Sequence, residues 1–301
     1  MRSSDPIHKK ALSEKLGTGF WLSLGWILIV LFCACFADFF PLPPFDHMDW
    51  DHPNAPLGTP ARVQVLKGEQ GSAPATFTHI LGTDSLGRDI LTRLVFGARI
   101  SLTVGFLTPL VGLLAGGILG MTAGFYRGRF EAFTMAAMDA ILAFPGLVLL
   151  LLVVFYMGSG LGLLVLALGF LTIPAFTRVA RANTLTFAKR EFVTAARAQG
   201  QNDVQILVRE ILPNIFMPML VYALLVVSYM IVAEGALSFL GLGVPSSTPS
   251  WGGMIAEGRE VLDGSAHVSL IPALILFLTV LSFNIIGDAV RGLTDAREGH
   301  L

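Results

Sequence analysis

The sequence predicts an all-α polytopic membrane protein with six transmembrane helices and both termini in the cytoplasm. Composition is the first reason: 54% of the 301 residues are hydrophobic and 14% are charged, and the mean hydropathy is +0.71. A soluble domain of ordinary composition is far less apolar. The other two reasons are a series of apolar windows, each about long enough to cross a bilayer, and the uneven distribution of Lys and Arg around them.

We expect six spans. They lie near Phe20–Phe40, Ser101–Phe125, Phe133–Tyr156, Leu161–Phe176, Ile215–Leu240 and Val268–Ile286. The first follows basic residues, as a signal peptide would. However, it exceeds the usual apolar core of about 7–15 residues and has no small-residue cleavage site before Asp38, so we interpret it as a retained anchor. Its Cys33 and Cys35 are expected to be packing thiols. The fourth span is short and is expected to be broken by Pro174.

The distribution of basic residues orients the chain. With the N-terminus inside, 14 of the 20 Lys and Arg residues fall on cytoplasmic segments, and the positive-inside rule selects this arrangement. Residues 1–18 are then the cytoplasmic N-terminus, 19–41 the first anchor, 42–99 an extracytoplasmic segment, 100–290 the transmembrane core, and 291–301 the cytoplasmic C-terminus.

The extracytoplasmic segment begins as a loop. Residues 41–75 are rich in Pro, Gly and Asp and show no sustained period. His47 and His52 stand among turn-forming residues without the spacing of metal ligands, which favours a solvated loop over a metal site.

An amphipathic helix is expected over residues 81–102, capped by Thr83 or Asp84. Asp89 and Arg93 would pair across one turn of its polar face. Its apolar face comprises Leu86, Ile90, Leu91, Leu94 and Val95. Such a helix would lie flat in the membrane interface and lead into the second span.

The second span contains Gly112, Gly116, Gly120 and Gly124, each four residues apart. Small residues at this spacing let helix backbones approach closely, which is how membrane helices associate in the absence of a hydrophobic drive. The spacing therefore predicts a helix-packing seam and places this span inside a bundle.

Few polar residues lie at membrane depth, where charges are costly and commonly functional. We assign a structural role to Asp139 and, near the cytoplasmic end of the last span, to Asn284, Asp288 and Arg291. Glu234, in the outer half of the fifth span, is as compatible with a pathway or gate role as with a helix–helix hydrogen bond.

The segment from Glu191 to Asn214 carries five charged side chains and cannot lie in hydrocarbon. It belongs to a cytoplasmic loop of residues 182–213 between spans four and five. Apolar residues at helical spacing precede Gly200 and resume after it, until Pro213. The pattern predicts a helix, a break at Gly200, a second helix and a stop at Pro213.

This segment resembles the loop by which bacterial ABC-importer permeases contact their ATPase subunits, written E-A-A, three residues, G, and then I-x-L-P. Thr194-Ala195-Ala196, Gly200 and Ile211-Leu212-Pro213 fall on that register. Thr194 replaces the usual glutamate, and Glu210 replaces the first isoleucine. The resemblance implies a coupling helix, and it implies that the residues contacting an ATPase are Glu191, Phe192, Thr194, Ala195, Ala196, Gly200, Asp203, Leu212 and Pro213.

Other blocks extend the resemblance over most of residues 78–297. GTDSLGRD with GARISL, the stretch from Ala236 to Ile255, and the stretch from Leu278 to Arg297 resemble the dipeptide, oligopeptide, nickel and glutathione subfamily of these permeases. Membership implies a bacterial inner-membrane subunit that forms half of a translocation pathway for peptides or similar solutes. Its implied partners are a second homologous permease, two cytoplasmic ATPases, an extracytoplasmic binding protein and membrane lipid, with no nucleic acid.

The sequence contains no catalytic constellation. A phosphate-binding G-x-x-x-x-G-K-[ST] loop is absent, as are H-E-x-x-H and G-x-S-x-G. We therefore expect a non-enzymatic chain that binds no metal and no cofactor, with ATP and Mg held by partner subunits. Two alternatives are an ion-coupled secondary transporter, which usually shows repeated halves, and a membrane scaffold without transport. Co-purification with ATPase subunits would distinguish the importer from both alternatives. The sequence does not identify the transported solute.

Overall fold

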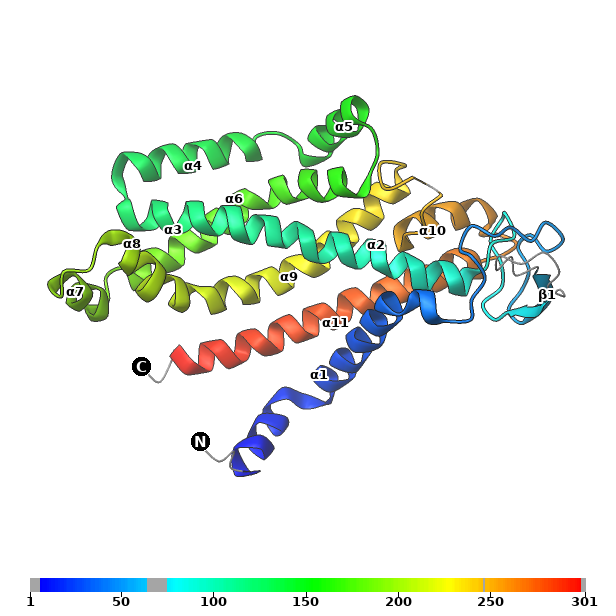
Figure 1. The fold of residues 1–301 in the computed structure, drawn as a ribbon, viewed down its shortest axis with the longest axis horizontal. Helices are drawn as coiled ribbons and strands as arrows, with labels where there is room; N and C mark the ends of the chain where they lie inside the picture. The colour runs from blue at the N-terminus through cyan, green and yellow to red at the C-terminus, as the bar shows by residue number, and fades with distance from the viewer. Residues whose placement is uncertain (1–5, 64–74, 246, 299–301) are drawn as a thin grey trace.

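The computed structural model describes residues 6–63, 75–245 and 247–298, and in this part of the chain long helices form one bundle (Figure 1). Five helical stretches are long and apolar enough to cross a membrane: Gly17–Cys35, Ile90–Tyr126, Leu161–Phe187, Asp203–Phe239 and His267–Gly292. A sixth span is formed if α4 (Gly128–Leu142) and α5 (Gly146–Met157), bent by 75° at Pro145, are counted together. The predicted all-α polytopic class is confirmed.

The first two spans have their own irregularities. α1 (Pro6–Cys35) is kinked at Gly17, where φ is +66°, and its apolar part follows the kink. α2 (Ile90–Val111), a π-helical turn η2 (Gly112–Gly116) and α3 (Gly117–Tyr126) form one continuous helix. The π turn follows Pro109, which has no N–H to donate to the helical ladder.

The interfacial helix expected over residues 81–102 is not a separate element. The helix begins at Ile90 and continues directly into the second span, and its cap is Asp89 rather than Thr83 or Asp84: the Asp89 side chain accepts the Thr92 N–H. The expected Asp89–Arg93 pair is also wrong. Both side chains are buried and face other segments, because tertiary partners satisfy them better than each other.

Two prolines do not end helices as the sequence suggested. α6 (Leu161–Phe187) is 27 residues long and continues past Pro174. α8 (Asp203–Ile206), a π-helical turn η3 (Leu207–Ile211) and α9 (Leu212–Phe239) form one helix through Pro213. The Leu212 N–H bonds the Leu207 carbonyl, five residues back, and this wider turn accommodates the missing donor of Pro213 without a break.

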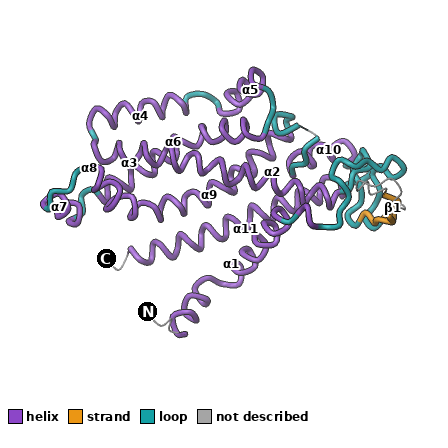
Figure 2. Tube along the Cα trace, in the orientation of Figure 1, coloured by secondary structure: helices purple, strands orange, loops and turns teal. Residues whose placement is uncertain are grey.

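The outer end of the molecule contains short elements that the sequence analysis did not predict: it placed residues 37–39 in the first anchor and residues 41–75 in a loop. A short 3₁₀ turn η1 (Ala37–Phe39) follows α1, and strands β1 (Thr59–Val63) and β2 (Ala75–His79) pair antiparallel with Thr59 opposite His79. Helix α10 (Trp251–Gly258), extended by a 3₁₀ turn η4 (Arg259–Val261), lies between α9 and α11 (His267–Glu298). Figure 2 shows strand only at this end of the molecule.

The arrangement of the helices places the loops at two opposite ends. α7 (Glu191–Ala198) lies at the end away from the β-hairpin, and both chain termini point toward that same end (Figure 1). α3 packs along α6, α9 packs on α2 and α11, and α1 packs on α11 and α2. α4 and α5 lie along α6 on the side away from α1 and α11.

The predicted topology follows from this separation of loops and can be tested by thiol labelling. In a version lacking Cys33 and Cys35, a cysteine at Gln201 should react with a membrane-impermeant reagent only from the cytoplasmic side, and one at Leu57 only from outside. Leu57 is exposed beside the hairpin and is the matched control. Labelling of the Gln201 position in right-side-out vesicles would overturn the assignment.

Candidate functional site

Helix α7 and its exit are built by local sequence signals. The helix begins after extended Arg190, with Glu191 in its first turn, where a carboxylate suits the helix dipole. It ends at Ala198, and Gly200, two residues later, has a φ of +81°, the left-handed conformation that glycine adopts readily. The Gly200 N–H bonds the Arg197 carbonyl at 3.0 Å, and the Gln201 N–H bonds the Ala196 carbonyl at 3.1 Å. This is a Schellman motif, and it explains the predicted break.

The second helix, α8, begins at Asp203, three residues after Gly200. The Asn202 side chain accepts the Gln205 N–H at 2.9 Å, and the Gln205 side chain accepts the Asn202 N–H at 3.1 Å, forming a capping box. Asp203, in the first turn of α8, has a carboxylate oxygen 4.0 Å from an Arg197 nitrogen, and both side chains are exposed. The turn between α7 and α8 is therefore defined by hydrogen bonds rather than left open.

One face of α7 is attached to the bundle. Val193 and Ala196 are buried in a cluster with Met121 and Phe125 of α3. The same cluster includes Ile206, Leu207, Ile211 and Ile215 at the start of the long α8–α9 helix. A displacement of α7 would therefore be passed to α3 and to α9.

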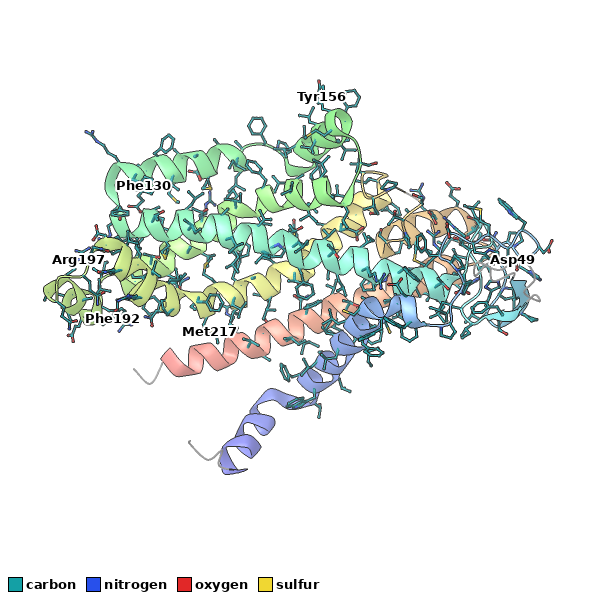
Figure 3. All side chains as sticks on the ribbon, in the orientation of Figure 1. Asp49, Phe130, Tyr156, Phe192, Arg197 and Met217 are labelled. Carbon is teal, nitrogen blue, oxygen red and sulfur yellow. The ribbon has the colours of Figure 1, made fainter. Side chains whose placement is uncertain are left out.

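The opposite face of α7 is exposed. It presents Glu191, Thr194, Ala195 and Ala198, and Leu212 and Pro213 are exposed nearby at the start of α9. Ala196 differs from the sequence expectation, because its side chain faces the chain's own core instead of the exterior. The guanidinium of Arg197 lies 5.4 Å from the centre of the Phe125 ring. Figure 3 shows Phe192 and Arg197 at this end of the molecule, far from Asp49.

The four glycines of the second span lie directly against α6. A β-carbon added at Gly116 would be 2.6 Å from the Ile173 carbonyl oxygen, and one at Gly124 would be 2.9 Å from the Arg181 carbonyl oxygen. One at Gly112 would collide with Thr172, and one at Gly120 with the Thr177 carbonyl. The partner of the seam is thus a helix of the same chain.

Glu234 lies where α2, α9 and α10 meet, and it is fully buried. The Ser101 hydroxyl of α2 donates to one carboxylate oxygen at 3.0 Å, and the Ser238 hydroxyl donates to the other at 2.7 Å. The Ser250 hydroxyl donates to Ser238 at 3.3 Å, just before α10 begins at Trp251. This arrangement makes Glu234 a helix–helix contact in the present conformation; the three serines had no distinguishing signal in the sequence.

The other polar residues singled out in the spans are distributed rather than gathered. The Asn284 amide oxygen accepts the Ser228 hydroxyl of α9 at 3.0 Å, which joins α11 to α9. Asp288 and Arg291 are exposed further along α11. Asp139 forms a 2.6 Å ion pair with Arg178 of α6. No group of three or more His, Cys, Asp or Glu side chains suited to a metal ion occurs among the described residues.

A buried charge network joins the outer loop to α10. Arg88 contacts Asp84 at 2.7 Å and Glu257 at 2.6 Å, and Arg93 contacts the same Glu257 oxygen at 2.9 Å. Both arginines are almost fully buried, so each needs these carboxylates to offset its lost hydration. Glu257 was missed by the sequence analysis because it lies 164 residues from Arg93.

His79 is held beside this network at the end of β2. Its Nδ1 lies 2.8 Å from Asp89, and its Nε2 lies 3.5 Å from Asp49. Burial by itself would lower the pKa of His79, but the hydrogen bond to Asp89 and the negative charges of Asp89 and Asp49 raise the pKa above its usual value. When His79 is protonated, both ring nitrogens carry a proton, so one N–H faces Asp89 and the other faces Asp49.

Comparison with known proteins decides the family. Residues 116–299 match the family described as binding-protein-dependent transport system inner membrane component. The chain belongs to this family. It is therefore a multi-pass inner-membrane permease subunit of a binding-protein-dependent ABC transport system, a class that is generally non-catalytic.

Two relatives illustrate the range of the permease family. The chain is 42% identical over 219 residues to a glutathione transport system permease protein of Pectobacterium atrosepticum, and the matched region covers 73% of each protein. It is 36% identical over 243 residues to a putative peptide transport system permease protein of Brucella suis, covering 81% of this chain and 82% of the relative. Among solved structures, the inward-facing MetNI methionine ABC transporter matches 67% of this permease and 97% of its own chain, with a TM-score of 0.55 and 18% identity. That likeness concerns the fold.

The permease's glycine seam predicts a sharp difference between neighbouring glycines. Gly120→Ala should destabilise the bundle by about 1–3 kcal/mol, because the new methyl group overpacks against the Thr177 carbonyl. Gly117→Ala is the matched control: its β-carbon would meet only the Met219 methyl group, at an ordinary 3.5 Å. Thermal unfolding in detergent measures both. Equal stability of the two variants would show that the seam does not constrain the fold.

The His79 contacts predict a pH dependence of stability. Because the folded-state pKa is raised, the contribution is complete below the unfolded-state value of about 6.5 and is lost as pH rises through the folded-state pKa. The melting temperature of the wild type should fall over that interval, and His79→Gln should remove this part of the slope. His47→Gln, in the same outer loop, is the control; an unchanged slope in His79→Gln would refute the assignment.

Proposed function

We propose that this permease forms half of the translocation pathway of an ABC importer for short peptides or peptide-like solutes. The second half would come from a homologous permease chain. Two cytoplasmic ATPases would supply energy, and an extracytoplasmic binding protein would deliver the solute. The observation that carries the proposal is the mounting of α7. Val193 and Ala196 hold this helix on the bundle, and its small-residue face is exposed at the end of the molecule away from the β-hairpin.

The geometry supports α7 as a coupling element in two ways. Thr194, Ala195 and Ala198 present short side chains, which allow a helix to seat closely in a groove of another protein. The buried face contacts α3 and the start of the α8–α9 helix, so a movement imposed on α7 would be carried into two spans. α3 is in turn fixed to α6 by the glycine seam. ATP-driven closure of the ATPases would then shift several spans together, as a two-state change.

ATP and Mg would bind to the ATPase subunits, since this chain has no phosphate-binding loop. The solute class is proposed from the relatives, whose names specify glutathione and peptide transport. The exposed Leu212 and Pro213, Asp203 and the turn at Gly200 would border the same contact. The family match supports the importer rather than the secondary transporter or the scaffold.

The decisive substitution is Ala195→Arg. A bulky charge on the exposed face should be desolvated on contact without a partner, which weakens ATPase association about tenfold or more and abolishes transport, while the permease still inserts and folds. Ala196→Arg should instead destabilise the permease, because it would bury a charge inside the chain's own cluster. Pull-down of the ATPases, uptake in reconstituted vesicles and thermal unfolding in detergent distinguish the two outcomes.

Gly292→Arg is the control for added charge. It lies near the cytoplasmic end of α11, and an added β-carbon meets nothing within 4 Å. This variant should bind the ATPases and transport normally. Wild-type uptake by Ala195→Arg, or equal loss with Gly292→Arg, would contradict the coupling role of α7.

A further inference from the structure

The ion pair of Asp139 on α4 and Arg178 on α6 is exposed, although both helices belong to candidate membrane spans. The two side chains are 65% and 51% exposed, respectively, and their charged groups lie 2.6 Å apart. Elsewhere in the described spans, Glu234 and Arg93 are fully or almost fully buried. In the membrane, this exposed pair must face lipid, water or another protein.

Helix geometry gives the depth of the pair. Asp139 lies eleven residues after the start of α4 at Gly128, and Arg178 lies nine residues before the end of α6 at Phe187. At about 1.5 Å per residue, these positions are roughly 16 Å and 14 Å from the ends of the two helices nearest α7. A hydrocarbon core is about 30 Å thick. Asp139 is also three residues before the end of α4 at Leu142, so the pair lies close to the bend between α4 and α5 and away from the helix ends nearest α7.

Lipid hydrocarbon is an unfavourable environment for such a pair. Charged side chains at membrane depth face the bundle interior or a water-filled cavity, because hydrocarbon neither hydrates nor hydrogen-bonds them. Four small residues are exposed near Asp139 on α4, alongside the larger Leu142: Ala132, Ala136, Ala140 and Ala143. Short side chains leave room above the charges, as a passage for solute requires.

The pair also keeps binding capacity. A guanidinium has five N–H donors and a carboxylate can accept about four hydrogen bonds, so the bond between Arg178 and Asp139 occupies only a part of each. A second pair, Glu131 with Arg181, links the same two helices closer to their cytoplasmic ends and is more buried. α4 therefore carries two carboxylates and α6 two guanidinium groups along their shared edge. Of the two ion pairs, Asp139 with Arg178 is the more accessible.

We propose that Asp139 and Arg178 line the water-filled translocation pathway and form a contact site for zwitterionic solutes. Asp139 accepts from the ammonium end of the solute, and Arg178 donates to its carboxylate end. This inference rests on the proposed import function and specifies where the solute is contacted. The site suits an amino acid or short peptide with free ends.

Water access tests the first part of the proposal without requiring transport. In the complete transporter lacking Cys33 and Cys35, cysteines at Ala136 and Ala140 should react with a charged methanethiosulfonate reagent in nucleotide-free inside-out vesicles. A cysteine at Ile29, on the exposed face of α1, is the lipid-facing control and should not react. Failure of both α4 positions to react would overturn the proposal, and would mean that lipid or a partner permease covers the pair.

Solute selectivity tests the second part. Uptake of alanyl-alanine should show a KM raised about tenfold or more in Asp139→Asn and in Arg178→Gln, since each loses a charged hydrogen bond. For N-acetylated alanyl-alanine, which lacks the ammonium group, the KM should differ little between wild type and Asp139→Asn. For the C-terminal amide of alanyl-alanine, which lacks the carboxylate, the KM should differ little between wild type and Arg178→Gln. Arg129→Gln, an exposed arginine in the first turn of α4, should behave as wild type.

The outcomes separate this inference from the import function. Equal losses for free and blocked peptides would overturn the contact site and leave import intact. Absence of uptake by the wild type for every peptide would count against the peptide-import proposal, and the labelling of Ala136 and Ala140 would still decide whether the pair faces water.

Discussion

Close contact between the α2–α3 helix and α6 is the constraint on which the rest of the bundle depends. In a membrane, helices gain little from burying apolar surface against each other, so they associate where small residues bring backbones together. Gly116, Gly120 and Gly124 supply that approach along three successive turns, and a methyl group on any of them would meet the α6 backbone or a side chain rooted on it. The seam ends next to Phe125, and Phe125 supports α7. The same contact therefore holds the core together and fixes the element proposed to meet the ATPases.

Polar groups are used at the two ends of the bundle and sparingly between them. At the outer end, Arg88 in the loop before α2 and Arg93 in α2 both contact Glu257 of α10, and His79 adds a pH-dependent contact. In the spans, Glu234 is satisfied by hydroxyl groups from two helices, which lets a carboxyl group hold α2 against α9 at depth. Outer segments and spans are thus joined as one unit, as expected if movements at one end are to reach the other.

The exposed Asp139–Arg178 pair contrasts with these buried groups. α4 contacts the bundle through α3 and α6, and α5 through α6, and much of their surface, including Phe133 and Phe155, is open in the single chain. Apolar side chains there suit lipid or another permease chain, whereas a charged pair suits water. The face of α4 that carries Asp139 is consequently where a single permease chain is least complete, and where half of a shared pathway is expected.

The sequence by itself determined the all-α polytopic class, the glycine seam and the break at Gly200, because each rests on a local pattern: apolar length, a four-residue spacing, and a residue tolerant of positive φ. It also placed α7, by its resemblance to a known loop. Only the tertiary structure decided that Pro213 lies inside a continuous helix, that Ala196 faces inward, and that residues 81–89 are a loop. The same holds for the partners of Arg93 and Arg178. These outcomes depend on contacts between segments far apart in the chain, such as Arg93 with Glu257 across 164 residues, and no short-range periodicity encodes which buried charge will meet which.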